Sequence, residues 1–243
     1  MTYSTHITEL NEKGYSVTAP LYSEHEVAQI LTCIENAEQN EKAFLKTNDL
    51  FAIRQLLKHV PKLNEVLFNK NLKALVSSIS ANTYFLTKAI YFDKPSNSNW
   101  FVAYHQDLSI SVDRKVAVDG YTNWTFKKEQ YGVQPPLNIL QDTVTIRIHL
   151  DTTNENNGAL KVIPASHLHG IIRMDSKEGL NFENEHICNV TKGGVMLMKP
   201  LTLHASNRTT NGKQRRVIHL EFNKQKLHSP LNWLEQHTVN FIT

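Results

Sequence analysis

The sequence predicts a mainly β fold, a barrel or a sandwich, that packs against helices near its N-terminus. Before Ser80 the apolar residues recur at helical spacing, whereas after Ser80 Val, Ile, Thr and aromatic residues gather in short runs. Turn-forming residues interrupt these runs, as in DKPSNSN at 93–99 and NENNG at 154–158. Many short strands separated by such turns are typical of barrels and sandwiches.

The N-terminal part, residues 1–80, is expected to be mostly helical and to support the sheet. Residues 15–20 (YSVTAP) predict one short strand before the helices. Ser23 and Glu26 have the spacing of a capping box, so a helix is expected to run from there to about Asn36. Two further helical patterns, at 51–60 and 63–79, are separated by Pro61.

The β core is expected over 81–223, and 224–243 form a C-terminal extension of the same single domain, 1–243. Strands are predicted at these positions: 83–92, 100–112, 142–150, 159–164, 194–199, 201–206 and 215–222. The stretch 113–141 is long and mixed, and it is predicted to be an inserted loop. Long loops of this kind are often functional lids, and a plain surface excursion is the alternative.

Two of these strands alternate between apolar and polar residues, so each has two distinct faces. In 143–151 the apolar face is opposite Thr145, Arg147, His149 and Asp151, and in 215–222 it is opposite Arg215, His219 and Glu221. A polar face normally meets water, but in a barrel it can line a pocket while the apolar face packs on helices. The pattern alone leaves this choice open.

Composition describes an ordinary globular protein and gives little support to charged partners. The 243 residues are 40% hydrophobic and 20% charged, and 26 basic against 23 acidic residues give a net charge of +3. This bias is too weak to indicate nucleic acid binding, and no apolar run is long enough to span a membrane. The polar start shows no secretory signal, and two distant cysteines, Cys33 and Cys188, suit a reducing cytoplasm, with one disulfide as the alternative.

The pair His105 and Asp107 is the first sign of chemistry. On a helix, residues two apart point in different directions, but on a strand they point to the same face. In the apolar run WFVAYHQDLSISV the two side chains could therefore hold one metal ion from one side. A lone pair of this kind also fits a surface strand with two polar residues facing water.

His204 supplies a second histidine, at the end of the apolar run LMKPLTLHASN. Two histidines and one carboxylate on a barrel are the ligand set of non-haem Fe(II) oxygenases, in which three coordination positions stay open for a 2-oxo acid and O₂. Arg215, further along the chain, could hold the distal carboxylate of 2-oxoglutarate as a two-pronged salt bridge. Ser206 shares a strand face with His204 and could add a hydroxyl donor.

With these residues, the chain resembles the phytanoyl-CoA dioxygenase family of Fe(II)/2-oxoglutarate oxygenases over roughly 83–222. The resemblance rests on His105-Gln106-Asp107, on NGALKVIPASH at 157–167, on His204-Ala205-Ser206 and on Arg215. Ala165 departs from the family's Pro-Gly-Ser-His turn, outside the metal site. The resemblance implies a double-stranded β-helix, or jelly roll. It also implies His105, Asp107 and His204 as iron ligands, with Arg215 and Ser206 binding 2-oxoglutarate. Because Asp107 is present where halogenating relatives have a small residue, the implied chemistry is hydroxylation or another oxidation.

Three residues are candidates for contact with the substrate: Lys88, Arg147 and Trp124. The resemblance places polar pocket residues near Lys88 and Arg147, whereas the alternatives are an edge-strand lysine that blocks aggregation and a solvent-facing arginine. If both point inward, their charge indicates an anionic substrate, such as a carboxylic acid or amino acid. Trp124, in the insertion, could close over it.

Other function classes stay open on the sequence alone. A catalytically silent barrel could bind metal or ligand as a regulator, although the intact triad with Arg215 argues against this. An oxygenase that acts on protein or RNA is another alternative, which the near-neutral charge weakly opposes. A cupin-like isomerase would usually supply more histidines in a tighter cluster. The expected partners are therefore a small-molecule substrate and O₂.

Overall fold

The computed structural model describes residues 3–37, 44–46, 51–80, 83–96, 101–173 and 181–239 of the chain. Two antiparallel sheets face each other, and a third, smaller sheet lies beside them. The large sheet has the strand order β1-β12-β9-β14-β4-β3-β2, the second sheet β11-β10-β13-β5, and the small sheet β6-β8-β7. The predicted mainly β architecture with N-terminal helices is therefore confirmed, although the sheets do not close into a continuous barrel.

The helices are α1 Ser4–Lys13, α2 Glu24–Glu35, α3 Leu56–His59, α4 Leu63–Leu67, α5 Lys70–Ser80 and α6 Leu137–Gln141. Short 3₁₀ turns occur at Glu155–Asn157, Ser166–His169 and Phe182–Asn184. The strands of the large sheet are β1 Tyr15–Val17, β2 Phe44–Lys46, β3 Phe51–Arg54, β4 Phe85–Lys94, β9 Val144–His149, β12 Val195–Met198 and β14 Arg215–Asn223. The second sheet contains β5 Val102–His105, β10 Leu160–Val162, β11 His186–Ile187 and β13 His204–Ser206, and the small sheet β6 Ile110–Val112, β7 Thr122–Lys127 and β8 Gln130–Gln134.

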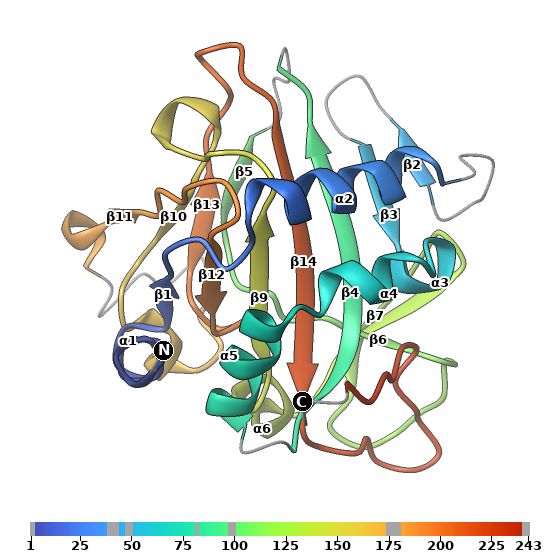
Figure 1. The fold of residues 1–243 in the computed structure, drawn as a ribbon. Coiled ribbons are helices and arrows are strands. Elements are labelled where there is room, and N and C mark those ends of the chain that lie inside the picture. The colour runs from blue at the N-terminus through green and yellow to red at the C-terminus, as the bar shows by residue number, and fades with distance from the viewer. Residues whose placement is uncertain are drawn as a thin grey trace.

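Helices α2 to α5 cover the outer face of the large sheet (Figure 1). The apolar residues of the alternating strands, such as Ile146, Ile218 and Leu220, are fully buried in the same core as Ile30 of α2 and Leu72 of α5. The capping box predicted for α2 is present, because Ser23 and Glu26 bond to each other's backbone N–H groups. The helices therefore pack on the apolar face of the large sheet, and its polar face points toward the second sheet.

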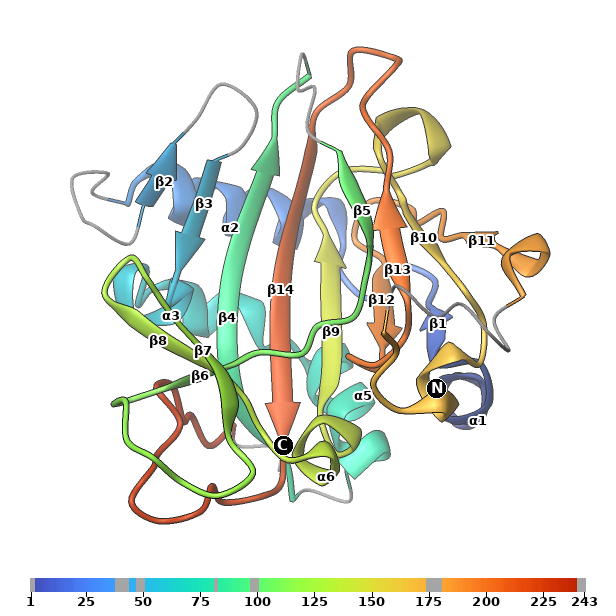
Figure 2. The same ribbon diagram turned by 180° about the vertical axis from the view of Figure 1, so that it is seen from behind.

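The second sheet covers that polar face, as the view from behind shows (Figure 2). All strand pairs in both sheets are antiparallel. The side chains of β14, β9 and β4 that point away from the helices thus meet those of β5 and β13 across the space between the two sheets. This space is where the sequence predicts the chemistry.

Two N-terminal predictions need correction. The predicted helix 51–60 is strand β3 followed by the short α3, because Phe51–Arg54 pairs with β4 and Ile53 is buried in the core that the helices share. The single helix predicted over 63–79 is two helices, α4 and α5. The break lies at Asn69, whose side-chain oxygen accepts the Leu72 N–H at 2.9 Å and so caps the start of α5.

The stretch 113–141 is the predicted loop only up to residue 121, and the hairpin β7–β8 and then α6 follow. Lys128 and Glu129 form its tight turn with φ of 52° and 59°, a conformation that usually requires Asn or Gly. The sequence therefore lacked the usual hairpin signal. The hairpin packs over a second core that includes Ile110, Val133 and, from the C-terminal segment, Trp233. None of the described helices is long and apolar enough to cross a membrane.

Candidate functional site

Three of the predicted ligands meet between the two sheets. His105 ends β5 and His204 begins β13, and the two are direct neighbours in register. Asp107 lies two residues beyond His105, where its backbone N–H donates to the Pro200 carbonyl at 2.9 Å. Its carboxylate is 3.7 Å from His105 Nε2 and 3.8 Å from His204 Nε2. The three ligand atoms all lie within 4.8 Å of one another, which fits a single metal ion.

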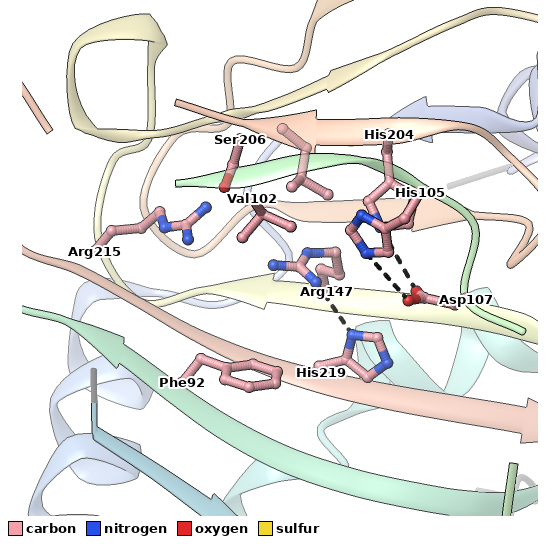
Figure 3. A pocket seen from close by; sticks show the side chains of 10 residues that line it. Phe92, Val102, His105, Asp107, Arg147, His204, Ser206, Arg215 and His219 are labelled. Carbon is pink, nitrogen blue, oxygen red and sulfur yellow. Dashed lines mark hydrogen bonds and ion pairs between the residues drawn. The ribbon is translucent and has the colours of Figure 1, made fainter. Parts of the chain in front are cut away.

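Backbone carbonyls fix the orientation of both imidazoles. His105 Nδ1 donates to the Ala103 carbonyl at 2.9 Å, and His204 Nδ1 donates to the Thr202 carbonyl at 2.8 Å. A carbonyl only accepts, so each ring carries its proton on Nδ1 and keeps the lone pair of Nε2 free. Both Nε2 atoms point toward Asp107 (Figure 3). Outer contacts of this kind are typical of metal-ligating histidines.

The protonation states also suit a metal. Burial lowers the pKa of His204 to about 4, more than the neighbouring Asp107 raises it. Burial alone would raise the pKa of Asp107, but His204, His219, His105 and Lys88 together outweigh it and hold that pKa at about 2. At neutral pH the site therefore offers a neutral imidazole and an anionic carboxylate, which are the forms that bind a metal ion.

The facing wall of the pocket is cationic. The pocket has a volume of about 160 Å³, with the triad at one end, Arg215 of β14 at the other and Arg147 of β9 between them (Figure 3). Both arginines are buried. Arg215 donates to the Gly158 carbonyl, and Ser206 of β13 lies across the pocket from it. Burial, and then the nearby Arg147, lowers the pKa of Arg215, as expected for two guanidiniums that lack an anion between them.

His219 also lines this pocket, although it was not among the site residues predicted from the sequence. Arg147 Nη1 donates to His219 Nδ1 at 3.1 Å, so His219 must carry its proton on Nε2, which faces Glu221 Oε1 at 3.0 Å. The Nε of Arg147 is buried with no partner among the described residues. The signal for His219 was its place on the same strand face as Arg215.

The other two substrate candidates lie elsewhere. Lys88 points inward, but its Nζ pairs with Glu221 at 2.8 Å and with the Ser109 carbonyl at 3.0 Å, outside the residues that line this pocket. Its charge is thus already balanced. Trp124 packs against the second core under the hairpin and does not line the pocket. Arg216 faces outward and holds Asp151 at 2.7 Å.

A comparison with known protein families shows to which family the chain belongs. The family description "Phytanoyl-CoA dioxygenase (PhyH)" matches residues 10–217. The chain belongs to the phytanoyl-CoA dioxygenase family. It is a 2-oxoglutarate-dependent oxygenase whose metal is Fe(II), and the triad of His105, Asp107 and His204 fits that metal.

Solved structures with the same fold belong to oxygenases of this kind. EctD from S. alaskensis, solved with 2-oxoglutarate and 5-hydroxyectoine, shares 17% identity at a TM-score of 0.70, over 93% of this chain and 78% of EctD. HygX from Streptomyces hygroscopicus, solved with nickel, 2-oxoglutarate and hygromycin B, shares 15% identity at 0.64, over 90% and 86%.

EvdMO1 is similar as well, with 17% identity and a TM-score of 0.66 over 90% of this chain. The chain spans about half of EvdMO1, 49% of its length. No curated protein matches the sequence. These likenesses confirm the jelly-roll fold that the sequence predicts.

Proposed function

We propose that this oxygenase hydroxylates a small organic substrate that carries an anionic group, with release of succinate and CO₂. The observation that carries the proposal is Arg147, a buried guanidinium inside the pocket whose Nε has no partner among the described residues. A buried charge without a counter-ion is unfavourable, so an arriving anion would stabilise it. Bound iron would activate O₂, which is the oxidant: 2-oxoglutarate and the substrate would each supply two electrons, so that one oxygen atom enters succinate as CO₂ leaves and the other enters the substrate.

We assign the side chains to the following roles. His105, Asp107 and His204 hold the iron. Arg215 and Ser206, at the far end of the pocket, hold the distal carboxylate of 2-oxoglutarate, which one guanidinium can bind through two parallel hydrogen bonds. Arg147 lies between these two groups and is left to contact the substrate.

Two observations support a small-molecule substrate. The pocket lies between two sheets and has a volume of only about 160 Å³, and HygX was solved with nickel, 2-oxoglutarate and hygromycin B bound. We further propose that 1–243 act as one catalytic domain, since the N-terminal helices share a core with the large sheet and the C-terminal segment completes the second core. The free thiols of Cys33 and Cys188 support a cytoplasmic location.

The test is succinate formation from 2-oxoglutarate with Fe(II) and O₂. The native protein should form succinate slowly without a substrate, and Asp107→Gly should form none because the metal loses its only anionic ligand. Comparison of metabolites in cells with and without the gene would then identify a substrate that stimulates turnover. The proposal fails if turnover is stimulated only by a neutral compound, or if the native protein binds iron and 2-oxoglutarate yet forms no succinate.

A further inference from the structure

A second cavity lies next to the iron pocket. It has a volume of about 260 Å³ and is lined by residues of β3, β4, β6 and the β7–β8 hairpin. The iron pocket, at about 160 Å³, is smaller than the roughly 300–1,000 Å³ typical of small-molecule sites. Iron and 2-oxoglutarate therefore leave little room there, and a substrate needs space beyond it.

The register of the large sheet shows that the two cavities adjoin. Arg147 pairs with His219, His219 with Ile90, and Ile90 with Arg54. Directly opposed residues on neighbouring strands share a face, so all four side chains point into the interior. The first two line the iron pocket and the last two line the second cavity. Strands are spaced about 4.8 Å apart, which places Arg54 roughly 14 Å from Arg147 along this row.

The residues that follow Asp107 in the chain also connect the two cavities. Asp107 belongs to the iron pocket, and Ser109, two residues later, lines the second cavity. Lys88 stands at the boundary: it lines the second cavity, while its partner Glu221 bonds to His219 of the iron pocket. A substrate in the second cavity would thus lie beside the metal ligands.

The second cavity is cationic. Three of the described residues that line it are basic and none is acidic: Arg54, Lys88 and Lys127. Glu221 balances Lys88, but Arg54 has no carboxylate partner among the described residues. The Nε of Arg54 is buried and without a hydrogen-bond partner in that part of the chain, and burial lowers the pKa of its guanidinium. Arg54 therefore lacks a counter-ion in the described part of the chain.

Hydroxyl groups complete the wall opposite. Gly132 of β8 lies between Thr125 and Ser111 in the small sheet. A Cβ at Gly132 would lie 2.6 Å from Thr125 Oγ1 and 2.9 Å from Ser109 Oγ, so glycine leaves room for both hydroxyls at this position. Hydroxyl donors next to a guanidinium are groups that bind an oxyanion.

We propose that this second cavity is the subsite for an oxyanion, a carboxylate or a phosphate or sulfate ester, on the substrate, and that Arg54 is its principal ligand. This inference rests on the proposed function and extends it: besides the anionic group that Arg147 meets, the substrate carries a second one on the hairpin side of the iron, at a distance from the carbon that is oxidised. Lys127, exposed on the hairpin, adds a second charge at the entrance.

The test is anion titration of the full-length protein by calorimetry, under anaerobic conditions with Fe(II) and saturating 2-oxoglutarate, which fills the Arg215 end of the iron pocket. Sulfate serves as the probe for tetrahedral oxyanions and acetate for carboxylates. The native protein should bind at least one of them, and Arg54→Met should weaken one binding site at least tenfold while any anion binding at Arg147 remains. Arg173→Met, at an exposed arginine, is the matched control and should bind as the native protein does.

Lys127→Met keeps the test valid if Arg54→Met fails to fold, because Lys127 is exposed, and it should weaken binding about threefold. The proposal is overturned if neither anion binds, or if Arg54→Met and Lys127→Met both bind like the native protein. Succinate formation by the native protein is measured separately. Arg54-dependent binding without succinate would contradict the proposed function alone, and succinate without Arg54-dependent binding would contradict the subsite alone.

Discussion

At the scale of single residues, the metal site depends on which nitrogen of each histidine is free. His105 and His204 each donate a hydrogen bond from Nδ1 to the carbonyl two residues earlier in the chain. The same local bond on two neighbouring strands aims both Nε2 atoms at one point. Strand periodicity predicted that His105 and Asp107 share a face, with a surface strand as the alternative. In the structure β5 ends at His105, and Asp107 reaches the site from the residues that follow the strand.

Removal of either histidine should abolish useful Fe(II) binding. Loss of an outer contact to a metal ligand already costs 10- to 100-fold in affinity, so His105→Ala and His204→Ala should each cost more than 100-fold. Metal content after dialysis against Fe(II) measures this. His169→Ala, at an exposed histidine, is the control and should keep native metal content. Native metal content in both triad variants would show that the ligands lie elsewhere.

Arg215 allows a matched comparison with its neighbour Arg216. Loss of one partner from a desolvated charge pair costs roughly 2–5 kcal/mol, so Arg215→Ala should weaken 2-oxoglutarate binding by well over tenfold with iron binding nearly intact. Arg216→Ala should have little effect, because Arg216 faces outward and pairs with Asp151. Calorimetric titration with 2-oxoglutarate separates the two. A larger loss in Arg216→Ala would reject the assignment of Arg215.

The charge balance around Lys88 could not be predicted from its own surroundings in the chain. Its partner, Glu221, lies 133 residues away and on the polar face of β14. The sequence showed two basic residues near the site, but only the fold shows that Glu221 balances Lys88 and that Arg147 keeps an unpartnered nitrogen. Long-range pairing of this kind has no local signature.

At the scale of elements, the turn before β10 supports Arg215. Gly158 has φ of 82°, and its carbonyl accepts from Arg215. A Cβ there would lie 2.9 Å from the Asn207 carbonyl oxygen and 2.9 Å from Lys94 Nζ. The sequence marks the turn, since Asn-Gly favours this conformation, but not the contact with Arg215.

Gly158→Ala should therefore lower both stability and cosubstrate affinity. A strained backbone of this kind costs of order 1–3 kcal/mol, and the close contacts with Asn207 and Lys94 add to that cost. We therefore expect a larger loss in urea unfolding than the strain alone gives, with weaker 2-oxoglutarate binding besides. Gly212→Ala is the control, because Gly212 also has a positive φ, 64°, but has open space where a Cβ would be. Equal effects of the two substitutions would mean that the close contacts at Gly158 do not matter.

Elements without a usual signal were the ones mispredicted. Phe51–Arg54 reads as the start of a helix, yet its pairing with β4 makes it a strand and turns Arg54 inward. The hairpin β7–β8 turns on Lys128 and Glu129, which rarely adopt positive φ. Both elements line the second cavity, so the substrate side of the site was less predictable than the metal side.

At the scale of the whole molecule, the two sheets carry different groups of the site. The second sheet, with the residues that follow β5, carries the metal ligands, and the large sheet carries the arginines (Figure 3). The C-terminal segment then closes the hairpin side, where Leu86 bridges to His237 and Val112 to Trp233. This segment also brings a carboxyl group, that of Glu235, into the interior.

Glu235 should make the stability of the whole protein depend on pH. Its Oε1 accepts the Ala89 N–H at 3.3 Å, and its Oε2 is buried without a partner among the described residues. Burial raises its pKa from 4.5 to about 7, although the Ala89 N–H and Lys88 lower it. The folded state therefore binds more protons than the unfolded state between these values, so the stabilising contribution is present below about pH 4.5 and is lost as pH rises to about 7.

At about 1.4 kcal/mol per pKa unit, the loss from this one group amounts to about 3 kcal/mol across that window. Glu235→Gln, which stays neutral, should match the native protein near pH 4.5 and exceed its free energy of unfolding by up to about 3 kcal/mol above pH 7. Urea unfolding at a series of pH values measures both curves, with Glu65→Gln, at an exposed position, as the control. If the free energies of unfolding of the native protein and of Glu235→Gln fall in parallel over this range, the carboxyl group of Glu235 is already ionised in the folded state. Lys88 would then stabilise two carboxylates, those of Glu221 and Glu235.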